Sequence, residues 1–137
     1  MIDYIRKTAD NQVLIVSSDK QVVMDKALHF VIEQLANERL SSLEGRITAV
    51  KKLFGFKAKC PIYLGRDLLL MQVLGIRSEK ALLINIYSIK SIQKLKNQKT
   101  RLTFNRNHFL DVGGFSSICE LLRKARIVEQ YRQKSDR

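Results

Sequence analysis

Apolar and polar residues follow two different periods in the first third of the chain. Residues 13–16 and 21–24 are largely apolar and flank a polar turn at residues 17–20, which predicts a small β-hairpin. From Asp25 onward the apolar residues recur at helical spacing, which predicts an amphipathic helix with Asp25 placed to cap its start. The apolar face of this helix consists of Leu28, Val31, Ile32, Leu35, Ala36 and Leu40.

A polar break at residues 41–44 separates this helix from a second, shorter one. The second helix is predicted to end at Gly55, because glycine readily takes the left-handed conformation found after a helix. Gly45 stands at the junction between the two helices, where we expect a backbone conformation that other residues resist. The apolar positions of the second helix are Ile47, Val50, Leu53 and Phe54.

Strand patterns dominate the stretch that follows the second helix. Residues 60–64 and 68–74 are apolar segments on either side of a turn at residues 65–67. Residues 81–88 begin with the alternation of a strand, and the apolar residues then recur at every third position. Because a flat strand does not produce that spacing, we expect a bulge or a short turn of helix near residues 88–91.

A turn at residues 96–99 leads to a further strand over residues 101–105, onto which residues 108–112 are expected to pair back. Because side chains alternate along a strand, this one should turn its apolar residues to one side and its polar residues to the other. The first set is Leu102 and Phe104, and the second is Arg101, Thr103 and Asn105.

A final helix follows Gly113 and Gly114, and Ser117 and Glu120 have the spacing of a capping box at its start. The predicted fold is α+β: an antiparallel β-sheet or half-barrel of about five to seven strands, with a C-terminal helix and two short helices in the N-terminal half. A pleckstrin-homology-like half-barrel would show the same order. We expect residues 1–137 to form one domain. The stripe of the last helix that should cover the sheet is Ile118, Leu121, Leu122, Ala125 and Val128.

Positive charge is concentrated in one segment of the chain. Fourteen of the 25 basic residues lie between Arg46 and Arg106, where Asp67 and Glu79 are the only acids, so this segment carries the whole formal net charge of +12. Such a block is typical of an electrostatic footprint for a polyanion, either nucleic acid or an anionic membrane surface. A solvated, lysine-rich sheet surface is the alternative.

Catalytic and metal-binding patterns are not found in the sequence. Cys60 and Cys119 form no paired motif, so we expect no disulfide, a reducing cytoplasm and two small apolar side chains. His29 is expected to be an ordinary helix residue and His108 to be solvated, since neither has the spacing of a zinc ligand. The polar start of the chain shows no signal peptide, and no apolar run is long enough to span a bilayer. We therefore expect that the protein is not an enzyme and that it binds no metal or cofactor.

Binding chemistry is better supported, because the basic residues cluster around a hairpin and around the exit of the second helix. Lysine and arginine contact phosphates, and arginine also fits the narrow minor groove of A-tracts. Asn85, Asn97, Asn105 and Asn107 are short enough to reach minor-groove acceptors, although each also suits an ordinary turn or strand edge. The candidate DNA-binding residues are Arg46, Lys51, Lys52, Lys57, Lys59, Lys94, Lys96, Lys99, Arg101, Asn105 and Arg106.

Two segments carry a family resemblance. Residues 41–46 (SSLEGR), followed by residues 55–62 (GFKAKCPI), resemble the hallmark of the bacterial competence transcription factor family, ComK. Residues 83–89, 102–105 and 115–117 are similar to later elements of the family in the same order. The chain departs from the family pattern at residues 70–75 (LMQVLG), which replace an aromatic-Pro-Thr-Ser segment, and at Leu83, which replaces a strand tryptophan.

The resemblance implies a cytoplasmic, DNA-binding transcriptional activator of DNA-uptake genes. Such a protein would recognise paired A·T-rich boxes in double-stranded DNA, largely through the minor groove and as a homo-oligomer. Two other classes stay open: a pleckstrin-homology-like module that binds anionic lipid, and a protein-interaction module whose charge serves only solubility. Salt-sensitive binding that favours A·T-rich duplex DNA would separate the first class from the other two.

Overall fold

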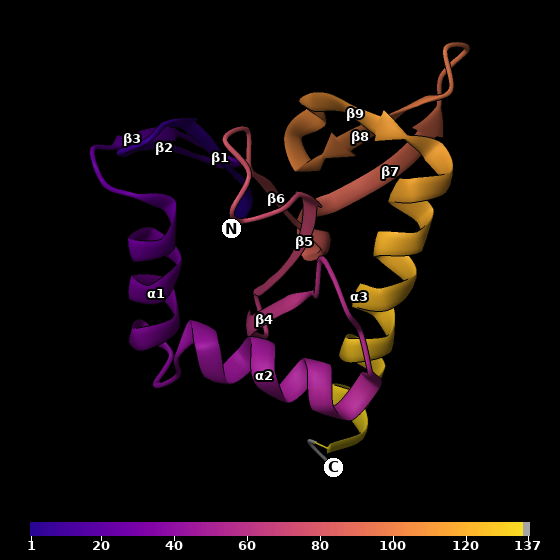
Figure 1. The fold of residues 1–137 in the computed structure, drawn as a ribbon. Coiled ribbons are helices and arrows are strands. Elements are labelled where there is room, and N and C mark those ends of the chain that lie inside the picture. The colour runs from indigo at the N-terminus through magenta and orange to yellow at the C-terminus, as the bar shows by residue number, and fades with distance from the viewer. Residues whose placement is uncertain (136–137) are drawn as a thin grey trace.

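Two antiparallel sheets and three helices make up residues 1–135, the part of the chain that the computed structural model describes (Figure 1). This is the predicted α+β architecture, but the strands divide into two sheets instead of forming one. The six-stranded sheet has the order β3-β2-β1-β6-β5-β4, from β1 (Ile2–Ala9), β2 (Gln12–Ser17), β3 (Gln21–Met24), β4 (Ile62–Gly65), β5 (Leu68–Leu74) and β6 (Leu82–Asn85). The three-stranded sheet has the order β7-β8-β9, from β7 (Ile89–Lys94), β8 (Lys99–Phe104) and β9 (Phe109–Gly114). The helices are α1 (Leu28–Glu38), α2 (Leu43–Phe54) and α3 (Phe115–Ser135).

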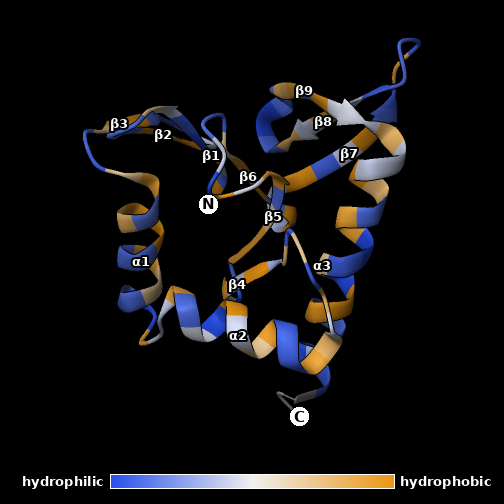
Figure 2. Cartoon of the chain, viewed as in Figure 1, coloured by the Kyte–Doolittle hydropathy of each residue, from blue (hydrophilic) through white to orange (hydrophobic). Residues whose placement is uncertain are grey.

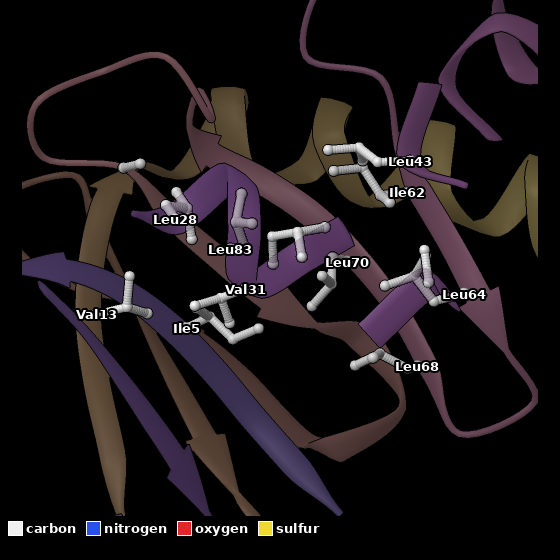
Figure 3. Packing of buried hydrophobic residues seen from close by; sticks show 13 residues of the cluster. Ile5, Val13, Leu28, Val31, Leu43, Ile62, Leu64, Leu68, Leu70 and Leu83 are labelled. Atoms are coloured by element: carbon white, nitrogen blue, oxygen red, sulfur yellow. The ribbon is translucent and has the colours of Figure 1, made fainter. Parts of the chain in front are cut away.

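The six-stranded sheet is covered on both faces. Helix α1 packs on one face, where Val31 and Ile32 join Ile5 of β1 and Leu83 of β6 in a buried cluster (Figure 3). The three-stranded sheet and α3 cover the other face, where Phe104 of β8 is fully buried. The predicted apolar stripe of α3 is confirmed, because all five of its residues are buried: Ile118, Leu121, Leu122, Ala125 and Val128.

Strand β1 lies near the centre of the six-stranded sheet, although the hydrophobic pattern predicts no strand there. It pairs with both β2 and β6, and Ile5 lies opposite Ile15 on one side and Leu83 on the other. Half of its eight residues are polar and they do not alternate with the apolar ones, so local periodicity does not reveal it. One of these polar residues, Asp3, is fully buried, and its carboxylate lies 2.6 Å from the His108 ring. Because the buried Asp3 contacts His108, a residue far away in the sequence, local patterns do not predict the strand.

The chain passes from one sheet to the other through a turn of 3-10 helix, η1 (Ile86–Ser88). The irregularity predicted near residues 88–91 is therefore confirmed, because η1 ends at Ser88 and the β7–β8 register shifts between Ile89 and Ser91. Asn85 precedes it and is fully buried; its amide donates to the carbonyl oxygens of Ile2 (2.7 Å) and Asp67 (2.9 Å). The same side chain accepts a hydrogen bond from the Leu69 amide. Asn85 does not reach a DNA groove, because its side chain joins three segments of the interior. The alternative left open by the sequence, a turn residue, is confirmed, since Asn85 also caps η1 by accepting a hydrogen bond from the Tyr87 amide.

Two helix starts differ from the prediction. Helix α1 begins at Leu28 after Ala27, with no side-chain cap, so Asp25 does not have the expected role. Helix α3 begins at Phe115, before Ser117, and the Glu120 carboxylate accepts hydrogen bonds from Arg123 at 2.6 and 3.0 Å. The capping box is therefore not formed.

Leu40, Cys60 and Cys119 differ in their burial. Leu40, predicted on the apolar face of the first helix, lies beyond the end of α1 and is 98% exposed. Of the cysteines, Cys60 is buried as expected. Cys119, also expected to be a small apolar side chain, is exposed on α3.

Gly45 lies in the first turn of α2, and its role differs from the one predicted. Among the described glycines only Gly55 has a positive φ (68°), which confirms the predicted end of α2. The amide of Gly45 donates to Oγ of Ser42, the residue that caps α2, at 3.0 Å. A Cβ at position 45 would approach that oxygen to 2.7 Å. The position therefore needs glycine for space beside the cap, not for an unusual backbone conformation.

Gly45→Val should displace the Ser42 hydroxyl and remove the cap. The expected cost is about 1 kcal/mol, or a fall in melting temperature of about 4 °C in a thermal circular-dichroism scan. Adding Gly45→Val to Ser42→Ala should cost little more than Ser42→Ala alone, because the same cap is lost. A melting temperature unchanged by Gly45→Val would contradict this role.

Candidate nucleic-acid interface

The structure divides the candidate residues into two groups at opposite ends of α3 (Figure 1). Helix α3 has 21 residues, so it is about 30 Å long. We call the group on the three-stranded sheet the hairpin surface: Lys94, Lys96, Lys99, Arg101, Asn105 and Arg106. We call the other the α2 group: Arg46, Lys51 and Lys52. Lys57 lies between the two groups, because its neighbours Phe56 and Ala58 contact Lys124 near the middle of α3. Lys59 belongs to neither, because it shares a surface cavity with Gly113 and Ser117 near the start of α3.

Strand β8 separates the hairpin surface from the core by simple alternation. Thr100, Leu102 and Phe104 are fully buried, whereas Lys99 is exposed and Arg101 is half-buried on the other side. This confirms the predicted directions of the apolar residues and of Arg101. Asn105 lies just beyond the strand, in the 3-10 turn η2 (Asn105–Asn107), and is exposed there.

Three lysines surround the turn that joins β7 to β8. Lys94, Lys96 and Lys99 are exposed, and none of the acidic side chains in residues 1–135 forms an ion pair with them. The backbone between them is held by hydrogen bonds from Leu95 to Lys99 (2.8 Å) and from Gln98 to Leu95 (3.0 Å). This hydrophilic turn projects beyond the rest of the sheet (Figure 2). It therefore presents three exposed ammonium groups on a hydrogen-bonded backbone, and that of Lys94 lies 5.8 Å from the centre of the Phe115 ring.

Arg101 is held in place by two residues of β9. Its Nε and Nη2 donate to the two carboxylate oxygens of Asp111 at 2.7 and 3.0 Å. Its guanidinium carbon lies 4.0 Å from the centre of the Phe109 ring, which is 54% exposed. The hydrogen bond from Arg101 lowers the pKa of the Asp111 carboxyl, which keeps it ionised as the partner of the guanidinium. Sequence reasoning missed Asp111 and Phe109, although the alternation of residues 109–112 places both on the outer face.

The far end of β8 carries a strained turn. Arg106 and Asn107 both have positive φ values, 68° and 63°, which non-glycine residues seldom adopt. The Asn107 side chain accepts a hydrogen bond from Lys90 at 3.0 Å. His108 follows, stacked on Phe104 at 5.1 Å and in contact with the buried Asp3. His108 is therefore a link between the two sheets, not the solvated residue that the sequence predicts.

The α2 group is less uniform. Arg46 donates to Oγ of Ser41 at 2.7 Å, and its guanidinium lies over the Tyr63 ring at 5.3 Å. This side chain helps to join α2 to β4, in agreement with a structural role. Lys51 and Lys52 are exposed in the last turn of α2, where a positive charge also favours the helix end. Lys57 is exposed in the loop that follows.

Comparison with known proteins gives a match to one family model. Residues 4–134 match the family model described as ComK protein. No curated protein matches the chain. Among solved structures, a chain described as the LytTr DNA-binding domain of a methyl-accepting/DNA response regulator from Bacillus cereus is 12% identical. The match covers 88% of this chain and 80% of that one, with a TM-score of 0.42, which is too low to support a functional conclusion.

Proposed function

This chain belongs to the ComK family, and from that premise we propose that it binds A·T-rich duplex DNA through the hairpin surface to regulate DNA-uptake genes. Membership of the family points to a competence transcription factor and not to an enzyme. The observation that carries the proposal is the segment of +12 formal charge. Five of the fourteen basic side chains of this segment are exposed on the three-stranded sheet and its turns: Lys90, Lys94, Lys96, Lys99 and Arg106.

Phosphate contacts are assigned to the two ends of β8. Lys94, Lys96 and Lys99 lie at one end and Arg106 at the other, separated by six strand residues or roughly 20 Å. That length corresponds to about six base pairs of duplex DNA. Flexible ammonium groups suit phosphates better than bases. The two ends would therefore fix the position of the protein on the duplex.

Sequence preference is assigned to the residues between these anchors. Arg101 lies on the outer face of β8, and Asn105 follows at its end. Arginine is favoured by the enhanced negative potential of a narrow A-tract minor groove. We assign the α2 group, Lys57 and Lys59 to additional phosphate contacts. The α2 group lies about 30 Å from the hairpin surface along α3, which is the length of about nine base pairs of duplex DNA.

The test is a fluorescence-anisotropy titration with an A-tract duplex, a mixed-sequence duplex of the same length, and vesicles containing an anionic phospholipid. Each phosphate contact should contribute about −0.9 to the slope of log K against log salt, so several contacts should give roughly −4 to −7. The A-tract duplex should bind more tightly than the mixed one. Recognition of paired boxes should give at least two protein molecules per duplex.

Two results would contradict the proposal. The first is a flat salt dependence or no binding to duplex DNA at low salt, which would remove the role of the charged segment. The second is binding to vesicles but not to DNA, which would favour a lipid-binding module. In residues 1–135, no helix has the length and apolar character needed to cross a membrane.

A further inference from the structure

We propose that Asp111 and Phe109 are specificity-determining residues, which set the preference for A·T-rich DNA by holding the Arg101 guanidinium in one orientation. This role rests on the proposed function and refines it. Arg101 and Asp111 are directly opposite each other on β8 and β9, and Phe109 is opposite Thr103, one step along the same face. All three therefore lie between the lysine turn and the Arg106 turn, at the centre of the hairpin surface.

The contacts with Asp111 and Phe109 leave part of the Arg101 guanidinium available to other hydrogen-bond acceptors. Of its five N–H groups, Asp111 occupies one on Nε and one on Nη2, and three remain for other acceptors. The Phe109 ring, 4.0 Å away, covers one face of the group. Bidentate pairing and stacking restrict a side chain that otherwise has many rotamers, so less freedom is lost when DNA binds. Arg101 is thus preorganised in a way that the nearby lysines are not.

Arg101 differs in net charge from the residues to which phosphate contacts are assigned, because it is paired with an acid. Asp111 cancels the formal charge of Arg101, so the pair adds little to the general attraction for DNA, and the carboxylate repels phosphates. A hydrogen-bond donor that is held in place and carries little net charge contributes to affinity mainly where acceptors of suitable geometry are present. The floor of a narrow minor groove offers such acceptors. The pair should therefore change the ratio of affinities for two sequences more than the affinity for DNA in general.

Phe109 distinguishes this arrangement from an ordinary surface ion pair. Exposed ion pairs contribute little to stability, and Phe109 is a large aromatic side chain that stays 54% exposed on the side of β9 away from the buried Val112. It supports the guanidinium and places an apolar surface beside it. Minor-groove proteins present apolar side chains in this way, next to arginine.

The test compares Asp111→Asn with the wild-type protein on the A-tract and mixed-sequence duplexes. The variant should bind the mixed duplex at least as tightly, because a repelling charge is removed, while the A-tract to mixed affinity ratio should fall about fivefold, or about 1 kcal/mol. Arg101→Ala should lower the ratio by a similar factor, and adding Asp111→Asn to it should lower it no further. Asp10→Asn, which removes an exposed acid in the β1–β2 turn, should leave the ratio unchanged.

A second pair of variants tests the aromatic ring. Phe109→Ala should lower the ratio as Asp111→Asn does, and Phe109→Tyr should preserve it. Circular dichroism before each titration confirms that the variant is folded. A ratio that is unchanged in Asp111→Asn, or that falls equally in Asp10→Asn, overturns the inference, as does wild-type binding with no A·T preference. A wild-type protein that binds no duplex at all overturns the proposed function itself.

Discussion

Replacing Lys94, Lys96 and Lys99 together with glutamine should weaken binding to duplex DNA by roughly two to three orders of magnitude at about 0.1 M salt. Each lysine that contacts a phosphate releases bound counterions, so the loss of three contacts should also reduce the salt slope by about 3. The A-tract and mixed duplexes should be affected equally, because phosphate contacts carry no direct sequence information. Anisotropy titrations at several salt concentrations measure both quantities.

The matched control for this variant is glutamine at Lys7, Lys20 and Lys26, three lysines of the N-terminal region. It removes the same formal charge from a part of the chain outside the basic segment. Its affinity should stay within severalfold of the wild-type value, and its salt slope should be almost unchanged. Equal losses in the two triple variants would mean that net charge alone governs binding, with no contribution from the hairpin surface.

The second large effect is expected from Phe104→Ala. The Phe104 side chain is fully buried between the sheets and α3, with its ring 5.7 Å from Tyr4 and 5.1 Å from His108. Truncating such a phenylalanine costs about 3–5 kcal/mol, a large part of the stability of an ordinary domain. The melting temperature should fall by more than about 10 °C. Because Phe104 ends β8, DNA binding should also weaken.

Phe109→Ala is the matched control for that experiment, since it removes the same ring from the exposed face of the same sheet. Its melting temperature should change by only a few degrees. Thermal and denaturant unfolding of the two variants gives the comparison directly. Similar losses of stability at positions 104 and 109 would be inconsistent with the burial of one ring and the exposure of the other.

Local patterns predicted those parts of the fold in which neighbouring residues determine the structure. The β2–β3 hairpin, the end of α2 at Gly55 and the alternation along β8 follow from short-range periodicity and turn chemistry. Strand β1 and the role of Asn85 were not predicted, because both depend on partners far away in the sequence. Asn85, for instance, bonds to the carbonyl of Ile2. The residues of a short sequence segment give no indication of that contact.

The candidate site likewise contains residues that local patterns predict and residues that depend on distant partners. The three lysines of the β7–β8 turn were identified from their charge and their place beside a turn. The pairing of Arg101 with Asp111 requires the register of β8 against β9, and a turn of a different length would pair other residues. The separation of the hairpin surface from the α2 group depends on the length and direction of α3, which one segment of charge in the sequence does not reveal.

The most direct measurement of the central claim is an amide-resolved NMR titration of the wild-type protein with the A-tract duplex. The largest shifts should fall on residues 94–101 and 105–111, that is, on the β7–β8 turn, the outer face of the small sheet and the Arg106 turn. Residues 51–57 should shift less. Shifts concentrated on α2 and the loop that follows it, with the hairpin surface unchanged, would contradict the assignment of DNA binding to the three-stranded sheet.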